Sequence, residues 1–244
     1  MSFPAGWVPV STSRANQLLH TVSGLGPRGV TYEPKSPYLR VSFGQTTFDA
    51  EGVEAPGRWF SRQIHHPGGD GSGVTIGRGY DMGLRTTLQV ERELTLAGVS
   101  EVDAKMLATG VGLRGARAED FVATNREYAP ILSLEAQHAL FERVVAPEII
   151  SDISRILTKP DVVEKYGGVE WGGLNPGIKE LLFDLRYRGD YTPNSRILLQ
   201  QHIVENNTEK LLEVLEKREY WRSVGVPESR IDARIEMLRL AGKG

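Results

Sequence analysis

The residues best suited to chemistry gather in one glycine-rich segment, 72–83. Val74 and Ile76 alternate with Thr75, a period of two that predicts a β-strand with Thr75 pointing away from the two apolar side chains. Asp81 follows six residues after Thr75, where a hairpin can return its carboxylate to the same space. A hydroxyl beside a carboxylate can hold and activate a water molecule. The glycine spacing does not meet the dinucleotide-binding fingerprint, so we exclude nucleotide binding here.

A second carboxylate lies upstream. Glu51 follows Phe48 and Ala50 and is followed directly by Gly52. Glycoside hydrolysis needs one carboxylic acid to protonate the leaving oxygen and one carboxylate opposite it. A partly apolar setting suits the acid, which must stay protonated near neutral pH. Glu51 has such a setting, whereas Asp81 sits among glycines in a polar loop and suits the ionised partner.

Two rival assignments stay open. Glu54 lies three residues after Glu51 and would be the acid if the preceding helix continued that far. Asp70 lies five residues before Thr75, in a glycine-rich turn, and could replace Asp81 as the second carboxylate.

Two further groups of residues could bind a substrate or a metal, but their sequence patterns are less specific. Arg58 and Trp59 place a cation beside an aromatic ring, which suits sugar stacking and contact with substrate carboxylates, or packing of a loop on the core. The pair His65-His66 has no HExxH motif and no carboxylate at a matching helical spacing. We therefore expect no metal site, and acid–base hydrolysis by carboxylates requires no cofactor.

The run Thr75-Ile-Gly-Arg-Gly79 resembles the T-I-G-x-G strand of the phage-type lysozyme superfamily. The longer run from Gly73 to Asp81 is closest to the pesticin-like bacterial toxin branch. This resemblance implies that Thr75 and Asp81 are both catalytic and that Glu51 is the acid. It covers roughly residues 45–240.

The C-terminal half carries a looser resemblance. Residues 181–196 are similar to the buried helix and glycine turn of phage lysozymes, and Tyr220-Trp221 with the downstream arginines resembles the cluster that closes that fold. The resemblance implies that Arg230 pairs with the catalytic glutamate. We place Arg230 and Tyr80 among the substrate contacts, together with Arg58 and Trp59.

The function implied is that of a muramidase, which cleaves the β-1,4 bond between N-acetylmuramic acid and N-acetylglucosamine in peptidoglycan glycan strands. An antibacterial effector, bacteriocin or endolysin domain would fit. The alternatives are a lytic transglycosylase or chitinase-like glycosidase, and a non-catalytic cell-wall binding domain.

The surrounding elements are predicted to be mostly helical. A short strand is expected at 39–43, loops and a hairpin over 46–84, and helices afterwards. Helix starts are indicated at Ser100, Ser133, Pro176 and Thr192. Pro147 should kink or divide the helix of 134–157, and 160–175 is expected to be a loop. Two further helices are predicted at 207–219 and 227–241.

These elements predict an α+β, mostly helical class, and the resemblance implies a bilobal lysozyme-like fold. We expect an irregular extension at 1–45 and a catalytic domain at 46–244. Within that domain, a small β-hairpin lobe would cover about 46–98 and a helical lobe about 99–244.

Composition limits the partners. The net charge of -2 is evenly spread, which disfavours nucleic-acid binding, and no apolar run is long enough to insert in a membrane. No secretory signal is recognised at the N-terminus. We therefore expect a monomer that a delivery protein carries to the periplasm or cell wall of a target bacterium, where an immunity protein could oppose it.

Overall fold

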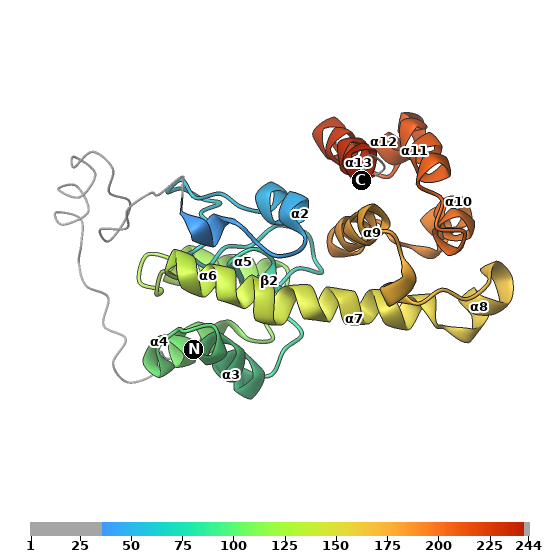
Figure 1. The fold of residues 1–244 in the computed structure, drawn as a ribbon. Helices are drawn as coiled ribbons and strands as arrows, with labels where there is room; N and C mark the ends of the chain where they lie inside the picture. Colours follow the sequence, from blue (N-terminus) through green and yellow to red (C-terminus); the bar gives the residue numbers. More distant parts are fainter. Residues whose placement is uncertain (1–35, 242–244) are drawn as a thin grey trace. The chain divides into compact units, whose positions relative to one another are not determined.

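The computed structural model describes residues 36–241, so most of the predicted extension at 1–45 lies outside the described residues. The described chain is mostly α-helical and contains one two-stranded antiparallel sheet (Figure 1). The predicted α+β, mostly helical class is confirmed. In the same part of the chain, no helix is both long enough and apolar enough to cross a membrane.

The described residues divide into two compact units. The first holds 36–40 and 51–144, and the second holds 41–50 and 145–241. The predicted lobe boundary at 98/99 falls inside the first unit, between helices α3 (Thr87–Leu96) and α4 (Glu101–Leu107), which pack against each other.

The first unit surrounds its hairpin with short helices. Strands β1 (Thr75–Ile76) and β2 (Tyr80–Asp81) pair antiparallel, as predicted. The helical elements of this unit, besides α3 and α4, are the 3₁₀ helices η2 (Pro37–Leu39) and η3 (Ala108–Gly110), and the α-helices α5 (Ala116–Asn125) and α6 (Leu134–Leu140). Its fully buried core includes Phe60, Ile64, Ile76, Tyr80, Met82, Leu94 and Leu140.

The strand predicted at 39–43 is wrong. The Ser36 hydroxyl accepts a hydrogen bond from the Tyr38 amide, and Pro37 occupies the first turn of η2. Because proline fixes φ near the helical value, the chain turns here instead of extending. Residues 42–43 then form a bend.

Side-chain caps fix the helix starts of the first unit. Thr86 forms a capping box with Gln89, and the hydroxyls of Ser100 and Ser133 accept amides three residues ahead. These caps satisfy amides that have no partner within the helix, which confirms the helix starts predicted at Ser100 and Ser133.

Proline at 147 changes the helix without ending it. Between α6 and α7 (Ala146–Leu157), residues Phe141–Val145 form a π-helical segment, η4. Proline has no amide hydrogen and clashes with the carbonyl four residues back, and a widened turn removes both problems. The chain passes from the first to the second unit inside this segment.

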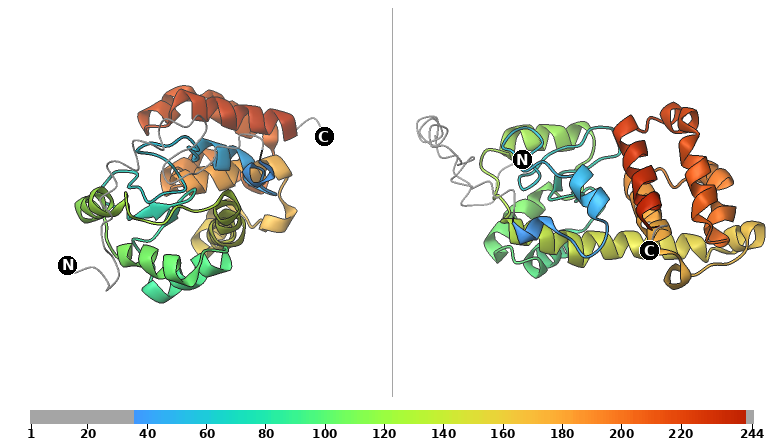
Figure 2. Two further views of the ribbon diagram at one scale, coloured as in Figure 1. Left: turned by 90° about the vertical axis from the view of Figure 1, so that its left-hand side faces the viewer. Right: turned by 45° about the horizontal axis from the view of Figure 1, so that its top comes forward.

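The second unit is entirely helical where it is described. Helix α9 packs on α13 and α2, and Figure 2 shows α13, drawn red, beside α11 and α12. The elements of this unit after α7 are α8 (Pro160–Tyr166), η5 (Trp171–Gly173), α9 (Pro176–Arg188), α10 (Pro193–Val204), α11 (Thr208–Glu216), α12 (Arg218–Ser223) and α13 (Glu228–Ala241), and α2 is Gln45–Ala50.

The helix starts predicted at Pro176 and Thr192 are confirmed, with Asn175 and Thr192 as the capping residues. The loop predicted for 160–175 is partly wrong, because α8 begins with Pro160 in its first turn and ends before Gly167. Proline is well tolerated in the first turn of a helix, since the amide it lacks would have no partner there.

A buried ionic network joins three helices of the second unit. The Asp184 carboxylate on α9 lies 2.6 Å from Arg234 Nε and 2.6 Å from Arg230 Nη2, both on α13. It also accepts the Thr47 hydroxyl of α2 at 2.9 Å. Arg234 is fully buried and reaches Asp190 at 2.6 Å with Nη2. Burial alone would raise the pKa of Asp184, but Arg234 and Arg230 hold it below its ordinary value.

Replacing Asp184 by Asn should destabilise the protein by about 3–5 kcal/mol, because two buried guanidiniums lose their shared counter-charge. Urea unfolding followed by circular dichroism measures this loss. Asp161→Asn is the matched control, since Asp161 pairs with Lys159 at the surface and should unfold like wild type. A D184N variant as stable as wild type would contradict the importance of this network.

The same network predicts a pH dependence. Because the folded pKa of Asp184 is depressed, its stabilising contribution is complete above the ordinary aspartate pKa of about 4 and is lost as the pH falls through the lower folded value. The difference in unfolding free energy between wild type and D184N should therefore shrink below about pH 4. Urea titrations at steps from pH 7 to pH 2 measure it. A difference that stayed constant over this range would contradict the assignment.

Candidate functional site

The hairpin places Thr75 directly opposite Asp81. The register pairs these two residues across β1 and β2, and opposite side chains in an antiparallel pair lie on one face about 4.5–5.5 Å apart at Cβ. The predicted return of Asp81 towards Thr75 is therefore confirmed. Gly77 and Gly79, both with positive φ, form the turn around Arg78.

Both side chains of this pair bind the backbone of Gly73. The Thr75 hydroxyl donates to the Gly73 carbonyl at 3.3 Å, and the Asp81 carboxylate accepts the amides of Gly73 at 3.0 Å and Gly83 at 2.6 Å. A Cβ at Gly73 would lie 2.3 Å from Asp81 Oδ1, so only glycine allows this approach. A carboxylate has about four acceptor positions, so Asp81, which is partly exposed, can still accept from a water molecule or a ligand.

Glu51 comes directly after α2 and is half-buried. The backbone that follows it packs on the hairpin turn, because a Cβ at Gly52 would lie 2.0 Å from the Arg78 guanidinium carbon. Val53 exchanges hydrogen bonds with Ser61, and the Ser61 carbonyl accepts the Gly77 amide at 2.7 Å. The chain on the C-terminal side of Glu51 is therefore fixed to the element that carries Thr75 and Asp81.

Glu54 is the centre of a second buried ionic network. Its side chain is only 8% exposed and pairs with Arg62 Nε at 3.0 Å and Arg78 Nη2 at 2.8 Å. The side-chain amide of Gln137 on α6 donates to it at 2.7 Å. A general acid must reach its substrate, and this carboxylate is enclosed by three donors. The geometry therefore gives Glu54 a structural role.

Asp70 lies in an exposed turn. Its backbone packs against Gly115, where an added Cβ would lie 3.2 Å from the Asp70 carbonyl oxygen. Asp81, not Asp70, is the carboxylate that the register places opposite Thr75.

The structure does not fit the prediction that Tyr80 contacts a substrate. Tyr80 is fully buried, its hydroxyl donates to Glu93 at 2.6 Å, and Arg85 covers its ring at 4.3 Å. Strand alternation explains this, because Tyr80 faces the side of the hairpin opposite to that of Asp81.

Arg58 and Trp59 are both exposed and stack at 4.9 Å in the first unit. Arg230 is buried in the second unit and forms an ion pair there with Asp184. The resemblance to lysozymes implied a different partner, Glu51.

The histidine pair contributes to the hairpin. His65 exchanges two backbone hydrogen bonds with Thr75, and its Nδ1 lies 3.0 Å from the Gln63 carbonyl. Burial lowers the pKa of His65. Among the described residues, no three His, Cys, Asp or Glu side chains form a group that could hold a metal.

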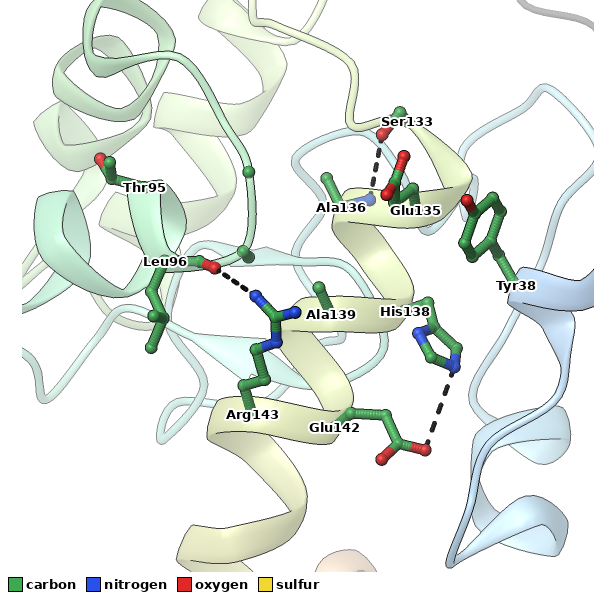
Figure 3. A pocket seen from close by; sticks show the side chains of 12 residues that line it. Tyr38, Thr95, Leu96, Ser133, Glu135, Ala136, His138, Ala139, Glu142 and Arg143 are labelled. Carbon is green, nitrogen blue, oxygen red and sulfur yellow. Dashed lines mark hydrogen bonds and ion pairs between the residues drawn. The ribbon is translucent and has the colours of Figure 1, made fainter.

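One hollow lies away from these residues. It has a volume of about 720 Å³ and is lined by η2, the end of α3 and one face of α6 (Figure 3). Arg143 closes one side by donating to the Leu96 carbonyl at 3.0 Å, and Tyr38 stacks edge-on against His138. None of the predicted site residues lines this hollow.

Sequence reasoning missed the residues that hold the hairpin in place. Arg62, Arg78 and Gln137 are all buried and all bind Glu54, although polar residues of these types are usually exposed. Of these three residues, only Arg78 lies in a segment that the sequence marks as functional, the glycine-rich motif of 72–83.

A family model described as a domain of unknown function (DUF8812) matches residues 44–235. The chain belongs to this family. The match begins just before α2 and ends within α13, so it includes Glu51, the hairpin and both ionic networks. No curated protein matches the chain.

Replacing Glu54 by Gln should destabilise the protein by about 3–5 kcal/mol, because a buried carboxylate shared by two guanidiniums is lost. Thermal and urea unfolding measure the effect. Glu101→Gln, an exposed change on α4, is the control and should unfold like wild type. A stable E54Q protein that had lost a measured activity would contradict this assignment and return Glu54 to the role of acid.

Proposed function

We propose that this protein is a peptidoglycan hydrolase of the lysozyme type, a muramidase. Glu51 protonates the glycosidic oxygen, and Asp81 with Thr75 holds and activates the attacking water. The cross-strand pairing of Thr75 with Asp81 carries the proposal, because it brings the hydroxyl of a buried threonine and a partly exposed carboxylate to one face of a hairpin. With water attacking from the face opposite the acid, the reaction inverts the anomeric centre.

The anchoring of Glu51 supports the same assignment. A general acid must be held in a fixed position relative to the base, since small displacements are costly in rate. The contact of Gly52 with Arg78 and the bonds from Val53 through Ser61 to Gly77 provide this rigidity. Exposed Arg58 and Trp59 in the same unit supply contacts for sugar rings and carboxylates.

In this proposal the two units correspond to the two lobes of a lysozyme-like fold. The first unit carries the hairpin, and the second provides the helical lobe with α9 at its centre. The protein acts as an antibacterial effector, bacteriocin or endolysin domain on the cell wall of a target bacterium, to which another protein delivers it.

One observation favours a lytic transglycosylase as the second candidate. Both carboxylate oxygens of Asp81 accept backbone amides, so this residue has a structural task that does not depend on activating water. A transglycosylase needs the acid but no water-positioning aspartate.

Replacing Glu51 by Gln should lower the rate of peptidoglycan cleavage about 10²- to 10⁴-fold, because the amide cannot protonate the leaving oxygen. Mass spectrometry of digested, purified peptidoglycan measures this, with reducing muropeptides expected from wild type. Glu101→Gln serves again as the exposed control and should cleave normally. Near wild-type cleavage by E51Q would remove Glu51 from the mechanism.

The same digests separate the alternatives. Products with 1,6-anhydro ends, formed equally well by an Asp81→Asn variant, would establish the transglycosylase. Binding to sacculi without any released fragment would overturn both enzymes and leave a cell-wall binding domain.

A further inference from the structure

A small hollow in the first unit is lined by both cationic and apolar side chains. It has a volume of about 390 Å³. Val122 and Ala123 of α5 supply the apolar part of the lining. Arg58, His66 and Arg126 supply the positive or titratable groups, and Glu119 the acidic one.

Arg126 is the fixed cation of this hollow. Its guanidinium donates to the Gln63 side-chain oxygen at 3.1 Å and to the carbonyls of Gly57 and Arg58. These acceptors are neutral, so they orient the guanidinium without cancelling its charge. Burial lowers the pKa of Arg126, yet the guanidinium stays charged at neutral pH because its ordinary pKa is above 12.

Arg58 is the second cation, and its acidic partner holds it weakly. Its closest approach to Glu119 is 3.7 Å, with both side chains more than half exposed. Exposed pairs of this kind contribute little to stability. An incoming carboxylate can therefore take the place of Glu119 beside Arg58, and a guanidinium binds carboxylates through two parallel hydrogen bonds.

The lining of the hollow is close in the chain to Thr75, one member of the candidate catalytic pair. His66 follows His65, whose backbone pairs with Thr75, and the charge of Arg126 contributes to lowering the pKa of His65. A ligand group held here would therefore be bound near the hairpin strand that carries Thr75.

We infer that this hollow is a subsite for a carboxylate on a small apolar residue, such as the terminal D-alanine of a peptidoglycan stem peptide. Arg126 and Arg58 bind the carboxylate, and the methyl group lies on Val122 and Ala123. The inference rests on the proposed function, since it assigns the peptide part of the same polymer to a subsite of the same unit.

The test measures binding of the dipeptide D-alanyl-D-alanine to the full chain by calorimetry or NMR titration, separately from any cleavage assay. A ligand of this size should bind with a dissociation constant of a few mM, on the order expected from its number of atoms. Its C-terminal amide, which lacks the charge, should bind at least about fivefold more weakly.

Three variants make the test specific. Arg58→Gln, an exposed change, should weaken dipeptide binding about three- to tenfold, while Glu119→Gln should strengthen it because the competing carboxylate is gone. Arg92→Gln, another exposed arginine of the first unit, is the control and should bind like wild type.

Equal binding of the acid and the amide, or no binding of either, would overturn the inference. Tighter binding of N-acetylmuramic acid than of the dipeptide would overturn the assignment to the stem peptide. Because binding is measured without turnover, dipeptide binding by a chain that cleaves no glycan would leave the subsite standing and refute the muramidase.

Discussion

The arrangement of the candidate site depends on one buried carboxylate. Glu54 lies where the segment after α2, the hairpin turn and helix α6 meet, and its two oxygens are shared among Arg62, Arg78 and Gln137. Burying a charge is costly unless it is paired and hydrogen-bonded, so each donor depends on the others. If Glu54 were absent, Arg78 would lose the ion pair that helps to hold it against Gly52. The position of Glu51 relative to Thr75 would then be less well defined.

The second unit also has a buried carboxylate at its centre that is paired with two arginines. Asp184 is completely buried and is shared by two arginines of α13 and by the hydroxyl of Thr47 on α2. Helix α2 ends at Ala50, immediately before Glu51. The segment that follows Glu51 belongs to the first unit and is fixed there by the network of Glu54. Such networks orient side chains more strictly than apolar packing does, because hydrogen bonds are directional.

The parts that could be predicted from sequence have local causes. The hairpin from Thr75 to Asp81 follows from strand alternation and the glycines of its turn, and the helix starts at Ser133 and Thr192 follow from capping side chains. Helix α8 was missed because its glycine-rich surroundings outweighed the signal of Pro160. The partners of Glu54 could not be predicted, because Arg62, Arg78 and Gln137 come from separate segments and look like surface residues in the sequence. The burial of Tyr80 depends in the same way on Glu93 and Arg85, which the sequence does not mark as its neighbours.

The close contact of Gly52 with Arg78 has a consequence for the family as a whole. No side chain larger than hydrogen fits at position 52 while the guanidinium occupies its present place, and that place is fixed by its ion pair. The two positions are therefore not free to diverge independently. Alanine or serine in place of Gly52 would displace the Arg78 guanidinium and weaken its ion pair, which would leave Arg62 as the main cation beside Glu54. We therefore expect residues at positions 52, 54 and 78 to vary together among members of the family.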